Sequence, residues 1–514
     1  MSRVICDIPL NRVEGDLEIR VAVEDGRIVE AWSSGTLYRG FENLLTGRAA
    51  LDALVITPRI CGICTTTHLN AAARCLDEVA GIVPPDNAIR LRNIALLVEH
   101  VQSDVRQAIL MFLVDFANPA YAGRPWFDEA SARFAPLAGG SALEAIRETK
   151  KILEIIAILG GQWPHSSFMV PGGVTQMPNI AELVACRALI GRFRQWYERQ
   201  VLGCEVAEWE AVDSLDALEG WREAAPSHGA GDLGWLLRLG TDTGVDRIGA
   251  GVDHFLSFGL AEMPRESILR RGAETHVFAA GSVRGGECAP LDGERIGESI
   301  AASHYEGYEG LRHPREGITR PRAPDGDHGR YSYSKAPRYA GEPAETGPLA
   351  EAVVAGDPLF ADWIARRGPS ALAREAARLT RPARLLPVID AWLGELIRHH
   401  EEPFIVHPSG MLDGEGAGLI NAARGGLGHW AKIECNRIAR YQIITPTAWN
   451  GSPRDDAGVP GPWEAALIGT PVRDPGNPVE AGHVIRSFDP CLVCTVHAFD
   501  PRSGASGTLR LGGG

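Results

Sequence analysis

The sequence predicts an α+β fold that is predominantly helical, with a central bundle of long helices, small peripheral β-sheets and long loops. Apolar residues recur with helical spacing over long stretches in the middle of the chain, whereas they alternate with polar residues near its start. Two Cys-x-x-Cys pairs lie near opposite ends of the 514 residues. A site built from both pairs closes only when the whole chain folds together, so we expect a single large unit.

The N-terminal region is expected to contain a β-hairpin. Leu17 to Glu24 alternate apolar and polar side chains, Asp25-Gly26 follows, and Arg27 to Val29 resume the alternation. An Asp-Gly pair between two alternating runs is typical of a two-residue hairpin turn.

A long helix is expected from Asp86, where an N-cap residue precedes apolar residues at helical spacing as far as Leu113. Pro119 marks its end, because proline cannot continue a helix. The same pattern predicts further helices over residues 141–159, 181–201 and 381–400.

The segment from about 281 to 347 is rich in Gly, Pro, Arg and Tyr, which predicts long ordered loops with short strands. The chain length would allow about three average domains. We nevertheless expect no clean domain boundary, since the two cysteine pairs tie the ends of the chain to one site.

Charge and hydropathy exclude several classes of partner. The formal net charge is -14 and no basic stripe is present, which disfavours nucleic acid and anionic membranes. No apolar run is long enough for a transmembrane segment, and no secretory signal opens the chain. These features predict a cytoplasmic protein, with attachment to the inner face of the membrane only through partners.

The two cysteine pairs predict a buried metal site. They are Cys61-Gly62-Ile63-Cys64 and Cys491-Leu492-Val493-Cys494. Four thiolates suit zinc, iron or nickel, and a structural zinc is the commonest use of such a set. Zinc ribbons, however, bring their pairs together over roughly 15–20 residues. The separation here favours a reaction centre assembled by the complete fold.

The other cysteines are scattered singly, without the spacing of an iron–sulfur motif. Most are expected to be inert core thiols. They are Cys6, Cys75, Cys186, Cys204, Cys288 and Cys435.

Several motifs, in order along nearly the whole chain, resemble the large, catalytic subunit of nickel-iron hydrogenases, and specifically the cytosolic uptake branch (group 2-like). Their combination is far more specific than any one of them. They are Asn11-Arg12-Val13-Glu14-Gly15, Arg39-Gly40-Phe41-Glu42, Arg59 to His68, Pro85 to Ala88, Tyr333 to Tyr339, Ala423-Arg424-Gly425, Trp449 to Asp455, and Asp489 to His497.

The resemblance implies that all four thiolates, Cys61, Cys64, Cys491 and Cys494, bind nickel. Cys64 and Cys494 would also bridge to an iron that carries two cyanides and one carbon monoxide, Fe(CN)2(CO). His68 would donate a hydrogen bond to a bridging sulfur. A core histidine satisfied by a backbone carbonyl is the alternative for His68.

The resemblance also assigns proton transfer to Glu14, together with Cys494. A carboxyl buried near thiolates has a raised pKa and can exchange protons near neutrality. The alternative is a solvated carboxylate. Asp16 stands where many relatives have His, which fits the cytosolic branch.

The resemblance places Arg424 over the open metal position. Its expected partner is Asp489, because a buried guanidinium needs a carboxylate. A surface ion pair is the alternative. Gln102-Ser103-Asp104 align with His-Asp-His of many relatives. Whether Asp104 completes the Arg424 cluster stays open at this point.

The resemblance to this family also implies a second ion, magnesium or iron, which would bind between Glu42 and His497. Carboxylate and imidazole suit such an ion. The alternatives are a salt bridge from Glu42 to Arg39 or Arg48, and an exposed His497. Residues 498–514, which end in three glycines, resemble a propeptide that a protease removes after metal loading, so 1–497 is the expected mature chain.

The expected activity is uptake hydrogenase turnover: heterolytic H2 oxidation to protons and electrons. Electrons need a carrier, and no iron–sulfur cluster is expected in this chain. The expected partners are therefore a small subunit with iron–sulfur clusters, forming a heterodimer that could assemble further, and the maturation protease and metal-insertion factors. The alternatives are an H2 sensor and a non-catalytic electron-transfer scaffold of the same fold.

Overall fold

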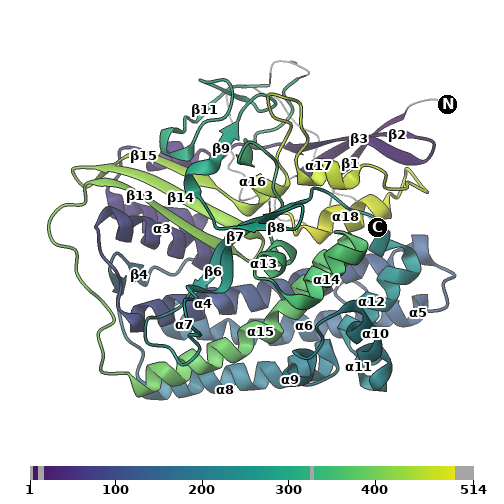
Figure 1. Cartoon of the computed structure of the whole chain (residues 1–514), viewed down its shortest axis with the longest axis horizontal. Helices are drawn as coiled ribbons and strands as arrows, with labels where there is room; N and C mark the ends of the chain where they lie inside the picture. The colour runs from purple at the N-terminus through teal and green to yellow at the C-terminus, as the bar shows by residue number, and fades with distance from the viewer. Residues whose placement is uncertain (1–3, 10–16, 325–328, 492–514) are drawn as a thin grey trace.

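Four long helices lie side by side and form the core of the molecule in a computed structural model that describes residues 4–9, 17–324 and 329–491. Helix α15 packs against α4 and α8, and α6 packs against both α4 and α8 (Figure 1). Their bounds are α4 Asp86–Arg106, α6 Gly140–Ile152, α8 Ile180–Trp196 and α15 Ala371–Arg398. The predicted helical bundle is therefore confirmed.

The other helices of the described residues lie outside this bundle. They are α1 Phe41–Leu45, α2 Ala53–Ile56, α3 Thr65–Val79, α5 Phe127–Phe134, α7 Glu154–Gly160, α9 Val206–Trp209, α10 Leu215–Ala224, α11 Pro226–Ala230, α12 Asp232–Thr243, α13 Pro348–Val354, α14 Pro358–Arg367, α16 Pro446–Asn450, α17 Pro462–Leu467 and α18 Val479–Ser487.

The strands of the described residues form small sheets of two or three strands, as predicted. The sheets are β1-β2-β3, β4-β5, β6-β7-β8, β10-β11, β12-β9 and β13-β14-β15. Their bounds are β1 Val4–Pro9, β2 Leu17–Glu24, β3 Arg27–Gly35, β4 Met169–Val170, β5 Gly173–Val174, β6 His254–Glu262, β7 His276–Arg284, β8 Glu287–Ala289, β9 Ile296–Ser299, β10 Tyr305–Glu306, β11 Arg320–Pro321, β12 Ala336–Tyr339, β13 Gly414–Ala422, β14 Gly425–Glu434 and β15 Arg437–Ile444.

Helix α4 begins at the predicted residue, but Asp86 is its first residue and not its cap. The Asp86 carboxylate instead accepts backbone N–H bonds from Arg265 and Glu266, at 3.1 and 2.7 Å. Beyond Arg106 the helical path continues through a π-helical turn and a 3-10 turn, and it ends at Ala117, before Pro119 as predicted.

Other helix predictions were right in type and wrong in extent. The predicted helix 141–159 is divided into α6 and α7. Helix α15 begins ten residues before the predicted start, where the Ser370 side chain accepts the N–H of Ala373 at 3.2 Å. Pro382 and Pro387 lie inside this helix. Proline is a strong local signal against a helix interior, and packing against α4 and α8 outweighs it here.

The predicted N-terminal hairpin is confirmed. Asp25 and Gly26 have φ angles of 52° and 72°, as a two-residue hairpin turn requires. The sheet β1-β2-β3 packs against the last helices of the described chain, with Val21 and Ile28 in one apolar cluster with Trp463, Leu467 and Phe488. The first and the last segments of the described residues therefore share a core.

The sheet β13-β14-β15 lies on helix α3 (Figure 1). Glycines make this contact unusually close: a Cβ at Gly418 would lie 1.9 Å from the carbonyl oxygen of Ala71. This contact fixes the hairpin between β13 and β14 relative to the helix that follows the first cysteine pair.

One large apolar cluster runs from Phe41 to Val479 and joins most of the described helices, as expected for a single large unit. Residues 281–347 are mainly loops with short strands and 3-10 turns, also as predicted. No helix among the described residues combines the length and apolar character that a membrane span requires.

Candidate metal centre

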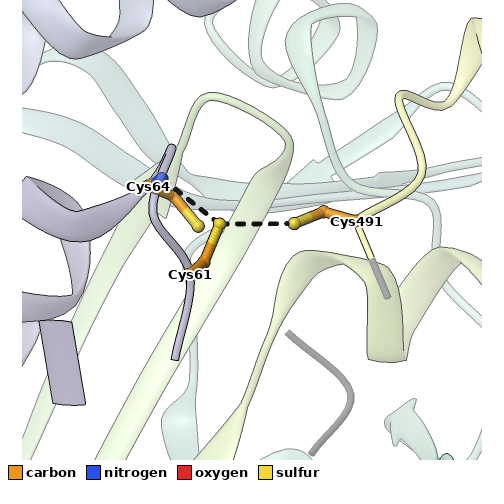
Figure 2. Close-up of side chains that lie close together, drawn as sticks. All are labelled: Cys61, Cys64 and Cys491. Carbon is orange, nitrogen blue, oxygen red and sulfur yellow. Dashed lines mark hydrogen bonds between the residues drawn. The ribbon is translucent and has the colours of Figure 1, made fainter. Parts of the chain in front are cut away.

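Cys61, Cys64 and Cys491 meet in the interior of the protein. Their sulfurs lie within 4.8 Å of one another, and those of Cys61 and Cys491 are 3.5 Å apart although 430 positions separate them in sequence. Figure 2 shows the three side chains pointing toward one point. All three are buried, with exposures of 1%, 4% and 0%. Cys494, Glu14 and His497 lie outside the described residues.

The sulfur separation fits two ligands of one metal ion. A disulfide would hold its sulfurs about 2.05 Å apart. Two thiolates bound at about 2.3 Å to a tetrahedral ion lie about 3.8 Å apart, near the observed 3.5 Å. Soft sulfur donors in a dry setting suit nickel and other soft transition metals.

The first pair is positioned by Arg39 and by the backbone. Arg39 donates to the carbonyl oxygens of Ile60 and Arg59, at 2.6 and 3.0 Å. The N–H groups of Ile63 and Cys64 both point at the sulfur of Cys61, each at 3.4 Å. Cys64 immediately precedes α3, and the helix N-terminus favours its anionic thiolate form.

Glu99 of α4 accepts hydrogen bonds from the free backbone N–H groups at the start of α3. The sequence did not reveal this role. The Glu99 carboxylate accepts the backbone N–H groups of Thr66 and Thr67, at 2.8 and 3.0 Å, and the Thr67 hydroxyl at 2.8 Å. Burial raises the pKa of Glu99 to about 7, even though these hydrogen bonds lower it. No local motif marks Glu99, because its partners are 32 and 33 residues away.

The second pair is approached through an unusual backbone turn. Asp489 follows α18 with a positive φ of 54°, a conformation that costs free energy in a residue with a side chain. The N–H of Cys491 then donates to the Thr447 hydroxyl at 3.1 Å, which anchors it to α16. The strained turn thus delivers both Asp489 and Cys491 to the site.

Arg424 lies at the tip of the two-residue turn between β13 and β14, where Ala422 pairs with Gly425. Its Nε is 3.1 Å from Asp489 Oδ2, and both side chains are buried, so the expected pair is present and is not a surface pair. Burial lowers the pKa of Arg424, but Asp489 and the thiols of Cys491, Cys64 and Cys61 raise it well above its usual value. Arg424 therefore carries a permanent positive charge beside the sulfurs.

The glycine after Arg424 packs closely against Thr346. At Gly425 φ is 124°, and a Cβ there would lie 2.2 Å from the Thr346 hydroxyl oxygen. The close approach is to protein atoms and not to a ligand.

Asp104 does not pair with Arg424. It binds Arg381 instead, through contacts of 2.6 and 2.9 Å. Arg381 also donates to Glu351 at 2.6 Å and to the carbonyl oxygen of Ala423 at 2.8 Å. The Asp104–Arg381 pair therefore supports the turn that carries Arg424, a role that sequence spacing gave no reason to expect.

Among the described residues, the ring of His68 contacts His429, with 3.1 Å between His68 Nδ1 and His429 Nε2. The contact is neither with a sulfur nor with a backbone carbonyl. His429 in turn contacts the Tyr441 hydroxyl through Nδ1 at 2.9 Å. Burial lowers the pKa of His68 to about 4, so its ring is neutral at physiological pH. The hydrogen bond from His68 to a bridging sulfur stays a prediction.

Glu42 is buried, and it pairs with Lys335 at 3.7 Å and not with Arg39 or Arg48. Its carboxylate accepts the N–H of Ile443 at 2.9 Å and the hydroxyl of Thr319. Glu298 lies 3.5 Å from the same Lys335 ammonium. Both carboxylates border a small cavity of about 40 Å³.

Comparisons with known proteins agree with this centre. The family described as "Nickel-dependent hydrogenase" matches residues 39–122 and 241–497. The large subunit of the periplasmic [NiFeSe] hydrogenase of Desulfomicrobium baculatum is 30% identical, over 98% of this chain and 96% of that protein. The uptake hydrogenase large subunit of Rhodobacter capsulatus is 27% identical, over 99% and 97%.

Solved hydrogenase structures also resemble this chain over nearly its whole length. The [NiFeSe] hydrogenase of D. baculatum superimposes with a TM-score of 0.81 at 29% identity, covering 96% of this chain and 100% of that chain. The Ni-Fe-Se hydrogenase of D. vulgaris Hildenborough gives 0.79 at 31% identity, covering 96% and 100%.

Proposed function

Since the chain belongs to the nickel-dependent hydrogenase family and is a hydrogenase large subunit that acts on H2, we propose that it catalyses heterolytic H2 oxidation in an uptake enzyme. The observation that carries the proposal is the meeting of three buried sulfurs, from positions 430 apart, beside the Arg424 guanidinium. The uptake hydrogenase of R. capsulatus is a full-length relative. Assignment to the cytosolic, group 2-like branch stays a prediction.

Cys61, Cys64, Cys491 and Cys494 would hold the nickel, with Cys64 and Cys494 shared with an iron that carries cyanide and carbon monoxide. When bound, this centre supplies the redox chemistry that takes up the electrons of H2. The protein supplies the rest: the fixed charge of Arg424 stabilises the neighbouring thiolates, and Asp489 keeps that charge in place.

Each H2 yields two protons and two electrons, and both products must leave a buried site. Cys494 and Glu14 would accept and pass on the protons. Among the described residues, the group made of cysteines alone is that of the centre itself. Electron transfer is therefore proposed to use an iron–sulfur small subunit, consistent with relatives named as large subunits.

A magnesium or iron ion would lie between Glu42 and His497. The carboxylate oxygens of Glu42 and Glu298 beside a small cavity suit a hard cation. Lys335 lies near both carboxylates, so it competes with such an ion for their charge.

Processing after His497 is proposed as well, and the family match that ends at residue 497 supports it. The mass of the mature chain would decide it. The cytoplasmic location stays a prediction, because a relative is named periplasmic. An H2 sensor remains the alternative function, while a scaffold without metal is disfavoured by the complete set of cysteines.

Metal analysis with infrared spectroscopy tests the centre. We expect nickel and iron, together with bands from bound carbon monoxide and cyanide, in the purified complex. Cys491→Ser should lose nearly all nickel, because it removes a sulfur at the meeting point. Cys75→Ser should keep it, since Cys75 is buried outside the centre and donates only to the Gly416 carbonyl oxygen. Zinc without nickel in the wild-type protein would overturn the proposal.

Glu14→Gln tests the proton route. The amide cannot release a proton, so we expect H2/D2 exchange with water to fall by about 100-fold or more while nickel content stays unchanged. Full exchange activity in this variant would remove Glu14 from the mechanism.

A further inference from the structure

A second group of metal-type ligands lies near α9, α10 and α11. The sulfur of Cys204, a carboxylate oxygen of Glu208 and an imidazole nitrogen of His228 all lie within 4.8 Å of one another. His228 Nε2 and Glu208 Oε1 are 3.1 Å apart. Unlike the nickel centre, this group comes from one short stretch of the chain.

Glycine permits the backbone approach that brings Cys204 to His228. Gly203 ends the preceding helical turn with a φ of 81°. A Cβ at Gly203 would lie 2.2 Å from the carbonyl oxygen of Ser227 and 3.0 Å from His228 Cα. Only glycine fits this contact, and it places the next residue, Cys204, beside the histidine.

Trp221 orients two of the three side chains. Its indole N–H donates to the Cys204 sulfur at 3.4 Å, and its carbonyl oxygen accepts from His228 Nδ1 at 2.5 Å. The Trp221 and His228 rings are stacked, with centroids 4.7 Å apart and planes 8° apart. Because a carbonyl oxygen can only accept, Nδ1 carries a proton, and Nε2 is the ring nitrogen that faces Glu208. Metal-binding histidines are commonly held by such a bond to a backbone carbonyl.

The local field favours a cation. Burial raises the pKa of the Cys204 thiol, the Trp221 hydrogen bond lowers it, and the charges of Glu208, Glu198 and Glu205 raise it further. Without a cation the thiol is therefore protonated at neutral pH. The same three carboxylates attract a positive ion to the sulfur.

We propose that Cys204, Glu208 and His228 bind one zinc ion, which fastens the end of the α8 helical segment to α11. Thiolate, imidazole and carboxylate are the usual zinc ligands. In a tetrahedral zinc site these atoms lie about 3.4–3.6 Å apart, a spacing that small side-chain rotations reach. The Glu208 side chain is 52% exposed, so water can fill the fourth position.

Binding has a simple balance. Zn²⁺ forms bonds to the Cys204 sulfur, His228 Nε2 and one Glu208 oxygen. The thiol releases its proton to solvent, and the proton that His228 Nε2 and Glu208 share when the metal is absent is released as well. A thiolate, a carboxylate and a neutral imidazole then leave the site with no net charge. The proposal goes beyond H2 turnover, because neither nickel nor iron takes part.

The test measures zinc in the purified enzyme complex after incubation with zinc chloride and removal of unbound metal. We expect one zinc per chain in the wild-type protein, with nickel unchanged by the incubation. Cys204→Ser and His228→Gln should lose this zinc, whereas Cys288→Ser should keep it, because Cys288 is an exposed cysteine outside the cluster.

Two further variants separate zinc binding from misfolding. Glu208→Gln changes an exposed side chain, so it should fold normally and still bind zinc more weakly. Trp221→Phe keeps the stacked ring and the carbonyl but removes the N–H, and should weaken zinc binding by about 10-fold. No stoichiometric zinc in the wild-type complex, or undiminished zinc in both Glu208→Gln and Cys204→Ser, would show that Glu208 and His228 form only an ion pair.

Discussion

Arg424 brings a permanent positive charge into a buried site. The thiols of Cys61, Cys64 and Cys491 lie close enough to raise its pKa. The contact with Asp489 is an ion pair without good hydrogen-bond alignment, since neither Nε nor Nη1 of Arg424 has a hydrogen-bond partner among the described residues. Asp489 thus balances the charge of Arg424 but leaves its Nη1 amino group without a hydrogen-bond partner among the described residues.

Arg424→Lys is expected to lower H2 oxidation by about 100-fold or more. Lysine keeps the charge, but its single ammonium cannot reach both Asp489 and the sulfurs as a planar guanidinium does. The assay is H2-dependent reduction of an artificial acceptor, at equal nickel content. Arg367→Lys, on an exposed arginine, is the matched control. Equal activity of the two variants would contradict this role.

Two contacts expected from the motifs are present among the described residues. Cys61, Cys64 and Cys491 meet, and Arg424 pairs with Asp489. The expectation of inert core thiols is correct for Cys75 and Cys186, which are buried, but Cys288 and Cys435 are exposed and Cys204 is half-buried. The side chain of Cys6 lies outside the described residues.

At the level of elements, the β13–β14 hairpin positions Arg424 at the metal centre. Arg381 holds the carbonyl oxygen of Ala423, and Gly425 allows the turn to pass close to Thr346. The turn is thereby fixed on both sides, which keeps the guanidinium in one position.

Gly425→Ala should destabilise this turn by about 1–3 kcal/mol and lower nickel content. The added methyl group would collide with Thr346, and alanine disfavours a φ of 124°. Thermal unfolding and metal analysis give the two readouts. Gly410→Ala is the control, because Gly410 also has a positive φ of 87° but no atom near its Cβ position. If the two variants lost equal stability and equal nickel, the backbone conformation alone would explain the effect, and the contact with Thr346 would not matter.

On the scale of the whole molecule, buried carboxylates join segments distant in sequence. Glu464 of α17 accepts the N–H of Ser33 at 2.9 Å and the hydroxyl of Tyr331 at 2.8 Å, both through Oε1. Burial raises its pKa to about 7. The first sheet, the long loop region and the C-terminal helices are thus tied together by a group that titrates near neutrality.

This linkage has a defined sign. Between the ordinary pKa of 4.5 and about 7, folded Glu464 binds the proton that the unfolded chain has released. Its contribution to stability is therefore full below pH 4.5 and is lost as the pH rises to about 7. The loss amounts to at most about 3 kcal/mol.

Glu464→Gln should flatten the dependence of the unfolding temperature on pH between 5 and 7. Glutamine keeps an oxygen acceptor for Ser33 and Tyr331 but does not titrate. Other buried acids remain in both proteins, so the difference isolates Glu464. Glu401→Gln, at a side chain that is 99% exposed, should leave the wild-type dependence unchanged. A parallel curve for Glu464→Gln would show that this carboxyl is already ionised in the folded protein.

The sequence by itself determined the family, the meeting of the two cysteine pairs through Cys61, Cys64 and Cys491, the N-terminal hairpin and the helical character of the core. These depend on local periodicity or on motifs whose residues are adjacent. Only the tertiary structure decided that Asp104 pairs with Arg381, that Lys335 pairs with Glu42, and that Glu99 satisfies the start of α3. Such pairs join residues far apart in the chain. Which charge meets which depends on how the helices pack, and no local pattern of residues encodes that choice.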